Sequence, residues 1–264
     1  MNAASEGPFG ILLDIDGVLY VGDEPIDGAH EALEQLRKLG AGMRLVTNTT
    51  SRSRRQVCEH LEELGFGVTV EEVLTPAAMA VSYCAERGYE SVELIVSDGL
   101  REDLAPLGAP VAGEAVQAVI LGDVGARFDA ELLNRAFRLI MDGAELVALQ
   151  HNRYWRRADG LALDVGAYAA ALEYATRREA VVVGKPAEAF FQAAIVDMGL
   201  DSAVMIGDDV EADVGGAMAA GLPGVLVRTG KYRHDALPPE VTPTAVADSI
   251  ADVPALLERI LPGY

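Results

Sequence analysis

Two aspartates near the N-terminus, Asp14 and Asp16, follow directly on the apolar run Phe9–Leu13. A short apolar run that stops at a polar turn is typical of a buried strand. Residues two apart share one face of a strand. Both carboxylates can then meet one substrate, one as nucleophile and the other as general acid or base. The alternative is a strand that ends in a solvated turn, where Asp and Gly are common.

Polar residues also end three later apolar runs, and these motifs favour the chemical interpretation. In a parallel sheet the carboxyl ends of the strands lie along one edge, where open α/β sheets bind ligands. We therefore expect residues that are distant in sequence to gather in one crevice. The three motifs are Thr47-Asn48, Lys185, and Asp208-Asp209 with Asp213.

The Thr47-Asn48 motif and Lys185 suit an anionic ligand. Thr47 and Asn48 offer a hydroxyl, an amide and the backbone at the start of a helix to an oxyanion. Lys185 can neutralise phosphate oxygens and keep a nearby carboxylate ionised. The alternatives are turn chemistry before a capped helix for the first pair and a solvated loop lysine for Lys185.

The last motif adds further carboxylates. Asp208 is expected to face Asp14 and Asp16, and oxygen ligands without Cys or His favour a hard cation such as Mg²⁺. Asp213 lies one helical turn after Asp209, so the two share a face. One of them is expected to orient Lys185, and the alternative for Asp209 is a helix N-cap.

Strand-like and helix-like runs alternate along the chain, which predicts an α/β fold with a parallel sheet. Ser51 is expected to cap the second helix. Pro186 suits the first turn of the helix that follows it. Expected helices include 29–39, 76–87, 129–141 and 249–260. Expected strands include 43–46, 92–96, 118–121, 146–149, 180–183, 203–206 and 225–227.

Taken together, the motifs DIDGVLY, VTNTTS, VVGKP and VMIGDDVEADVGGAMAAG resemble the haloacid dehalogenase (HAD) superfamily of phosphohydrolases. The likeness is greatest to its capped, NagD-like class IIA members, in the branch that contains the phospholysine phosphohistidine inorganic pyrophosphate phosphatase. It extends over nearly the whole chain. The resemblance implies a Rossmann-like, doubly wound catalytic core at 1–76 and 181–264, with an inserted α/β cap domain at 77–180.

The resemblance also implies roles for individual residues. Asp14 is similar to the nucleophile that becomes an aspartyl phosphate, and Asp16 to the acid that protonates the leaving group and then activates water. An Asp at position 16 favours a phosphatase over a dehalogenase or an inactive scaffold. The implied Mg²⁺ ligands are Asp14, the Asp16 backbone carbonyl and Asp208. The implied phosphate clamp is Thr47 and Lys185, with Asp209 and Asp213 as supporting acids.

A stretch of the expected cap combines polar and aromatic residues, and this composition suits recognition of a leaving group. The alternative is that the single Trp packs in the cap's own core beside solvated arginines. The candidate specificity residues are His151, Asn152, Tyr154, Trp155, Arg156 and Arg157.

Composition narrows the possible partners and location. A net charge of −20 makes nucleic acid and anionic membrane surfaces poor partners. No run approaches the roughly 20 apolar residues that a membrane helix needs, and the first eight residues do not form a secretory signal. Cys58 and Cys84 lie far apart, which fits a reducing cytoplasm. Dimers are common in the resembled family, so a homodimer is among the expected assemblies.

These features predict a Mg²⁺-dependent phosphohydrolase that acts on a small phosphate monoester, phosphoamino acid or pyrophosphate. The sequence leaves open the physiological substrate and whether Mn²⁺ replaces Mg²⁺. One alternative is a phosphoacceptor module like a response-regulator receiver, although such modules are small and uncapped. Another is a non-catalytic interaction protein that retains the fold. A dinucleotide-binding protein is disfavoured because no glycine triplet opens a helix after the first strand.

Overall fold

The structure, a computed structural model, describes residues 9–157, 160–233 and 241–260, with the backbone alone at 155–157. The chain divides into two compact units. We call the first the core unit; it consists of Met1–Thr47, Cys58–Leu74 and Lys185–Tyr264. The second, the insert unit, consists of Asn48–Val57 and Thr75–Gly184.

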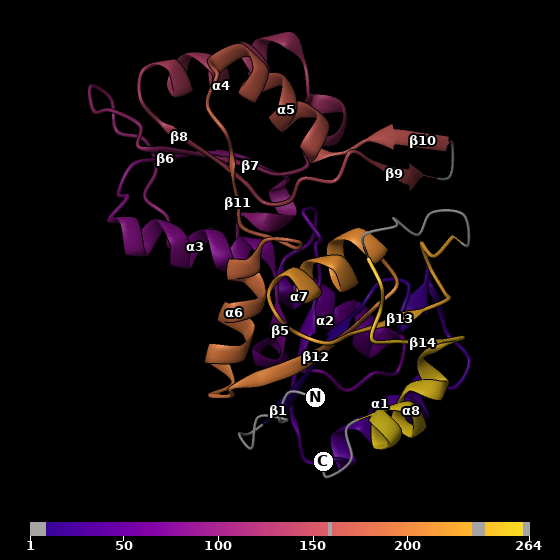
Figure 1. Ribbon diagram of the computed structural model, residues 1–264. Coiled ribbons are helices and arrows are strands. Elements are labelled where there is room, and N and C mark those ends of the chain that lie inside the picture. Colours follow the sequence, from indigo (N-terminus) through magenta and orange to yellow (C-terminus); the bar gives the residue numbers. More distant parts are fainter. Residues whose placement is uncertain (1–8, 158–159, 234–240, 261–264) are drawn as a thin grey trace. The chain divides into compact units, whose positions relative to one another are not determined.

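The core unit contains a six-stranded sheet in which every neighbouring pair is parallel. Its strand order is β14-β13-β12-β1-β4-β5, so the first strand of the chain lies in the middle (Figure 1). All six residues of β1 are buried, as expected for a strand covered on both faces. The strands are β1 (Phe9–Asp14), β4 (Gly42–Val46), β5 (Val73–Leu74), β12 (Ser202–Gly207), β13 (Gly224–Val227) and β14 (Ala245–Ala247).

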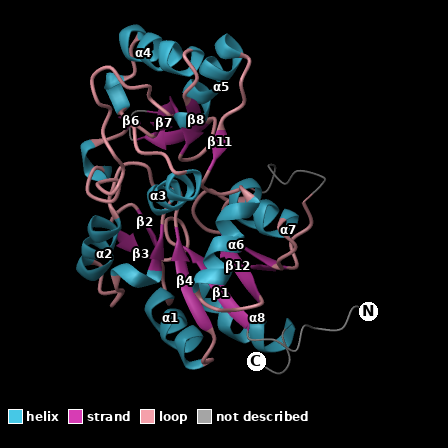
Figure 2. Ribbon diagram, turned by 90° about the vertical axis from the view of Figure 1, so that its left-hand side faces the viewer, coloured by secondary structure: helices cyan, strands magenta, loops and turns pink. Residues whose placement is uncertain are grey.

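Helices flank this sheet (Figure 2). Helix α1 (Ala29–Lys38) buries an apolar stripe of Ala29, Ala32, Leu33 and Leu36, and it contacts α8 (Val253–Ile260). The core unit also contains α6 (Glu188–Asp197), the short α7 (Gly216–Ala219) and, from Cys58 onward, α2 (Arg54–Glu63). A small hairpin of β2 (Tyr20–Val21) and β3 (Glu24–Pro25) follows β1.

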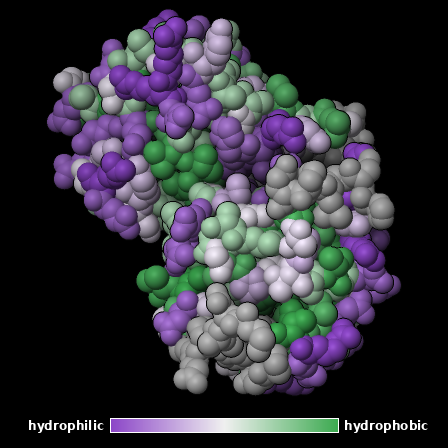
Figure 3. Space-filling view, in the orientation of Figure 1, coloured by the Kyte–Doolittle hydropathy of each residue, from purple (hydrophilic) through white to green (hydrophobic). Residues whose placement is uncertain are grey.

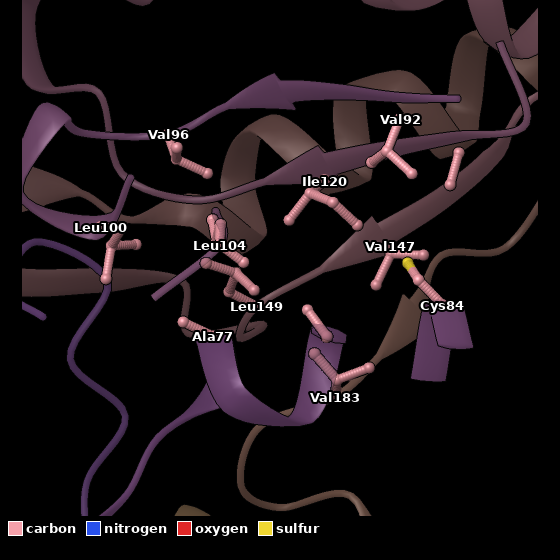
Figure 4. Close-up of a cluster of buried hydrophobic side chains, with 12 residues drawn as sticks. Ala77, Cys84, Val92, Val96, Leu100, Leu104, Ile120, Val147, Leu149 and Val183 are labelled. Atoms are coloured by element: carbon pink, nitrogen blue, oxygen red, sulfur yellow. The ribbon is translucent and has the colours of Figure 1, made fainter. Parts of the chain in front are cut away.

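The insert unit has its own parallel sheet with the order β11-β8-β7-β6. Alternate residues of β7 point to opposite faces: Ile120 packs in a cluster with α3, and Val119 in a cluster with α4 and α5. Figure 4 shows the α3 cluster, in which Ala77 and Cys84 lie near the strand residues. The strands are β6 (Val92–Ile95), β7 (Ala118–Leu121), β8 (Glu145–Ala148) and β11 (Val181–Val182); the helices are α3 (Pro76–Arg87), α4 (Ala130–Met141) and α5 (Val165–Thr176).

Local signals explain where these helices begin. The Thr75 hydroxyl accepts a hydrogen bond from the amide of Ala78 before α3, and the Asp129 carboxylate accepts one from Leu132 before α4.

An antiparallel hairpin of β9 (Tyr154–Arg157) and β10 (Gly160–Leu163) precedes α5. Hydrophilic residues cover much of the face of the insert unit visible in Figure 3.

The α/β, Rossmann-like class is confirmed, and several boundaries in the structure differ from the expected ones. The run 180–183 forms only β11, which pairs with β8, so it belongs to the insert unit and not to a core beginning at 181. The buried Val183 packs in the α3 cluster, which explains this placement. Helix α6 begins at Glu188, so Pro186 precedes it.

The segment Asn48–Val57 also belongs to the insert unit, because side chains of that unit bind its backbone. The Ser97 hydroxyl donates to the carbonyl of Ser51 at 3.1 Å. Helix α2 (Arg54–Glu63) is capped by Ser53 and not by Ser51: Ser53 and Gln56 exchange side-chain to backbone hydrogen bonds.

In the described ranges, no helix combines the length and the apolar character needed to cross a bilayer.

Candidate active site

Asp14 is the last residue of β1, at the carboxyl end of the central strand. Its side chain is buried, and its Oδ1 accepts a hydrogen bond of 2.6 Å from the Lys185 ammonium. Asp208 follows β12, the neighbouring strand. The sheet thus brings together residues almost two hundred positions apart in sequence, because parallel strands end at a common edge.

Lys185 lies between two carboxylates in the interior of the core unit. Its side chain is only 2% exposed, and its Nζ lies 2.6 Å from Asp14 Oδ1 and 2.6 Å from Asp213 Oδ1. The Val46 carbonyl, at the end of β4, accepts a longer hydrogen bond of 3.5 Å. The lysine is therefore a buried, charge-paired group and not a solvated loop residue.

Asp209 and Asp213 have different tasks. Asp209 caps the π-helical turn Val210–Gly215, and its Oδ1 accepts hydrogen bonds from the amides of Glu211 and Ala212. Asp213 pairs with Lys185, as expected for one of the two acids, and its Oδ2 accepts from the Asp209 amide. A Cβ on Gly207 would overlap the Asp213 carboxylate, so only glycine leaves room for it there.

Three buried carboxylates are close enough to bind one ion. One oxygen from each of Asp14, Asp208 and Asp213 lies within 4.8 Å of the others. Asp208 Oδ1 is buried and has no hydrogen-bond partner in the described part of the chain. Leaving such an atom unpaired is costly, and an all-oxygen donor set suits Mg²⁺. The residues present therefore fit a hard divalent cation.

The electrostatics of the cluster are unfavourable without that cation. Burial raises the pKa of Asp14 well above its usual range, and the neighbouring Asp213 raises it further, against the opposing effect of Lys185. Burial and Asp213 also raise the pKa of Asp208, to about 7. Burial by itself lowers the pKa of Lys185, but Asp14 and Asp213 outweigh it and raise that pKa. Such perturbed groups in one place are characteristic of functional sites.

Three further predicted site residues, Asp16, Thr47 and Asn48, lie in different surroundings. The Asp16 side chain is exposed and lies outside the carboxylate cluster, and its backbone forms a bridge with Tyr20. Thr47 is buried in the core unit, where its amide donates to the Leu74 carbonyl. Asn48 belongs to the insert unit.

One set of residues at the site escaped the chemical analysis of the sequence. The Lys231 amide donates to Asp208 Oδ2 at 2.6 Å, and its ammonium lies 3.3 Å from Asp209 Oδ2. The Thr229 hydroxyl donates to the Gly17 carbonyl at 2.5 Å. The available signal was the polar Arg-Thr-Gly-Lys stretch that follows β13, since it too stands at the carboxyl end of a strand.

In the insert unit, the candidate specificity residues begin shortly after β8. His151 and Asn152 are half-buried, and His151 Nε2 lies 3.4 Å from Glu173 Oε2. The side chain of Trp155 lies outside the described residues, as do those of Arg156 and Arg157. Gln150, which no motif in the sequence singles out, is buried beside these residues. Its side-chain amide donates to Asp164 Oδ1 at 2.5 Å, and its Oε1 accepts from the backbone N–H of Asn152 at 2.5 Å.

Two family profiles match this chain. The family profile described as Haloacid dehalogenase-like hydrolase matches residues 11–110, and the one described as HAD-hydrolase-like matches residues 182–253. The first segment includes Asp14 at the end of β1, and the second includes Lys185 and Asp208.

Whole proteins match over most of the chain. The Haloacid dehalogenase-like hydrolase domain-containing protein 2 of Rattus norvegicus is 42% identical over 84% of this chain and 85% of its own. The phospholysine phosphohistidine inorganic pyrophosphate phosphatase of Xenopus laevis is 38% identical over 95% of both chains.

A solved structure gives the same result for the fold. The glycerol phosphate phosphatase of Mycobacterium tuberculosis in complex with magnesium has a TM-score of 0.81 and 31% identity, and the match covers 93% of this chain and 75% of that one. With the sequence matches, this likeness confirms the resemblance found in the motifs. The chain belongs to the haloacid dehalogenase-like hydrolases.

Proposed function

We propose that this protein is a Mg²⁺-dependent phosphohydrolase that transfers the phosphoryl group of a small substrate to Asp14 and then to water. The observation that carries the proposal is the buried Asp14 carboxylate, held at 2.6 Å by Lys185 and close to Asp208 Oδ1, which has no hydrogen-bond partner among the described residues. Phosphoryl transfer depends mainly on positioning and on charge neutralisation, and these groups supply both.

In the first step an oxygen of Asp14 attacks phosphorus, and the bond from phosphorus to the leaving group breaks. Lys185 holds Oδ1, so Oδ2 is the attacking atom. Asp16, whose side chain is exposed and so open to an incoming substrate, donates a proton to the leaving group. Splitting one slow displacement into two is the advantage of a covalent intermediate.

In the second step Asp16, now ionised, takes a proton from water, and the resulting hydroxide attacks the aspartyl phosphate. Inorganic phosphate leaves and the Asp14 carboxylate is restored. Thr47 and Lys185 bind the phosphate oxygens in both steps. Asp14, Asp208 and the backbone carbonyl of Asp16 would hold Mg²⁺, which supplies positive charge against the phosphate.

The class of substrate rests on the relatives, whose names specify phospholysine, phosphohistidine, pyrophosphate and glycerol phosphate. We propose a small phosphorylated compound of this kind. The insert unit is proposed to act as the cap that selects the leaving group, with His151, Asn152 and Trp155 as its specificity residues. Cys58 and Cys84 are buried as thiols, which supports a reducing compartment such as the cytoplasm.

The test is a phosphatase panel of p-nitrophenyl phosphate, glycerol phosphate, pyrophosphate and phospholysine, with Mg²⁺ or with excess EDTA. Asp14→Asn is expected to lower kcat by about 10⁴-fold or more, and Asp16→Asn by about 10²–10⁴-fold. Asp23→Asn, an exposed acid in the β2–β3 turn, serves as the control with wild-type rates.

Each contrary outcome rejects a specific part of the proposal. Substantial turnover by Asp14→Asn would reject the nucleophile, and full activity in EDTA would reject the metal. A phosphorylated Asp14 that accumulates without release of phosphate would instead identify a phosphoacceptor module.

A further inference from the structure

The loop after β13 is hydrogen-bonded to the loop after β1. The Thr229 hydroxyl donates to the carbonyl of Gly17 at 2.5 Å, and Gly17 directly follows Asp16. We call the segment Thr229–Lys231 the strap. This single side-chain contact joins two loops that are more than two hundred residues apart in sequence.

The strap also fixes the orientation of Asp208. The Lys231 amide donates to Asp208 Oδ2 at 2.6 Å. A Cβ at Gly17 or at Gly230 would overlap that same oxygen, and both glycines have positive φ, +87° and +57°. The carboxylate therefore lies between two glycines, with Oδ2 bound by the strap. Oδ1 remains as the buried oxygen without a hydrogen-bond partner in the described residues.

The Lys231 side chain extends the strap to the next acid. Its ammonium lies 3.3 Å from Asp209 Oδ2, while Asp209 Oδ1 caps the turn that carries Asp213. The strap thus contacts the loop that follows Asp14 and β1 as well as the loop that carries Asp208 and Asp209 after β12.

We propose that Thr229 and Lys231 are positioning residues for the divalent cation: they turn Asp208 Oδ1 toward the ion and hold the Asp16–Gly17 backbone beside it. The inference rests on the proposed function only in the choice of ion. Binding of the ion is measured without substrate, so the two proposals can fail separately. If the wild type binds Mg²⁺ but hydrolyses nothing on the panel, the proposed function fails and the positioning role stands.

The test compares Thr229→Val, which removes the hydroxyl at nearly constant shape, with Thr229→Ser, which keeps it. Mg²⁺ affinity is measured by calorimetric titration of the full chain without substrate. Losing one short hydrogen bond is expected to weaken Mg²⁺ binding by about tenfold in Thr229→Val. Thr229→Ser should stay within about twofold of the wild type. Thr229→Ala removes the same hydroxyl with less apolar bulk, in case the Val variant folds poorly.

Thr244→Val is the matched control. Thr244 Oγ1 accepts a hydrogen bond from Gly224 at the start of β13, so this variant also loses one threonine hydroxyl bond in the core unit. Its Mg²⁺ affinity should equal that of the wild type.

Thermal unfolding in EDTA separates general destabilisation from a specific effect. If a variant lacking the Thr229 hydroxyl binds Mg²⁺ as the wild type does, or if the Ser variant fails to restore binding, the inference is overturned. A wild type that binds no divalent cation overturns it as well.

Discussion

Asp213 Oδ1 lies 2.6 Å from the Nζ of Lys185, and these side chains are only 1% and 2% exposed. Asp14 lies at the same distance from that ammonium. The buried ammonium of Lys185 is therefore paired with two buried carboxylates, and a third carboxylate, Asp208, lies nearby. This excess of negative charge works against folding and favours binding of a cation, a balance typical of functional sites.

Removing Lys185 should show how much the folded state depends on it. Lys185→Met leaves Asp14 and Asp213 without their shared cation in the interior, which typically costs about 3–5 kcal/mol in the free energy of unfolding. Urea unfolding at pH 7.5 in EDTA measures the change. Lys38→Met, at an exposed position near the end of α1, is the control and should change stability by less than about 1 kcal/mol. A similar small change for Lys185→Met would contradict the charge-paired role of Lys185.

Mg²⁺ affinity should depend on pH near neutrality. Burial raises the pKa of Asp208 to about 7, and only its ionised form suits the cation. Affinity should therefore fall by about tenfold from pH 8 to pH 6, with protons released on binding. Calorimetry in two buffers of different ionisation enthalpy measures both effects. An affinity that stays constant from pH 8 to pH 6 would contradict this expectation.

The same shift predicts how the metal-free protein responds to pH. The ordinary pKa of an Asp is 3.8, and that of Asp208 in the folded chain is about 7. Between these two pH values the folded chain retains a proton on Asp208 that the unfolded chain has lost. The contribution of Asp208 to the free energy of unfolding then decreases as pH rises through this interval. Comparison of urea midpoints for the wild type and Asp208→Asn, both in EDTA, isolates this contribution. A difference that is independent of pH would be evidence against the raised pKa.

Gly207→Ala should disturb the site although it adds only one methyl group. Its Cβ would overlap the Asp213 carboxylate, which must then leave Lys185 or shift the turn Val210–Gly215. Overpacking of this kind typically costs about 1–3 kcal/mol, and hydrolysis should fall as well. Gly67→Ala is a matched control, because no atom lies within 4 Å of its Cβ position. Equal stability of the two variants would show that the Asp213 carboxylate is free to move.

Two helix caps in the insert unit should differ in how much they contribute to the free energy of unfolding. Asp129→Ala removes a surface N-cap of α4, which typically costs about 1 kcal/mol. Asp164→Ala removes the cap of α5 and also leaves the buried Gln150 amide without its carboxylate partner, so we expect about 2–4 kcal/mol. Thermal unfolding of both variants measures this difference. Equal losses would mean that the Gln150 contact adds nothing to the cap.

The sequence predicted several strands well, because apolar runs that end in polar residues are a local signal. Expected strand 118–121 is β7 itself, and expected strand 203–206 lies within β12. The same signal could not assign 180–183 to a sheet, since pairing partners are not encoded locally. Nor could it distinguish Ser51 from Ser53 as a helix cap, because that choice depends on the reciprocal bonds with Gln56.

By itself the sequence determined the fold class, the family, and the residues that stand at the strand ends, because hydrophobic period and motif order follow from the chain alone. Only the tertiary structure decided which acid pairs with Lys185, that no described residue bonds to Asp208 Oδ1, and that Thr229 and Lys231 join the site. These are matters of distance and direction between segments far apart in the chain. They are settled when β1, β12 and β13 align in one sheet and their loops pack at its edge.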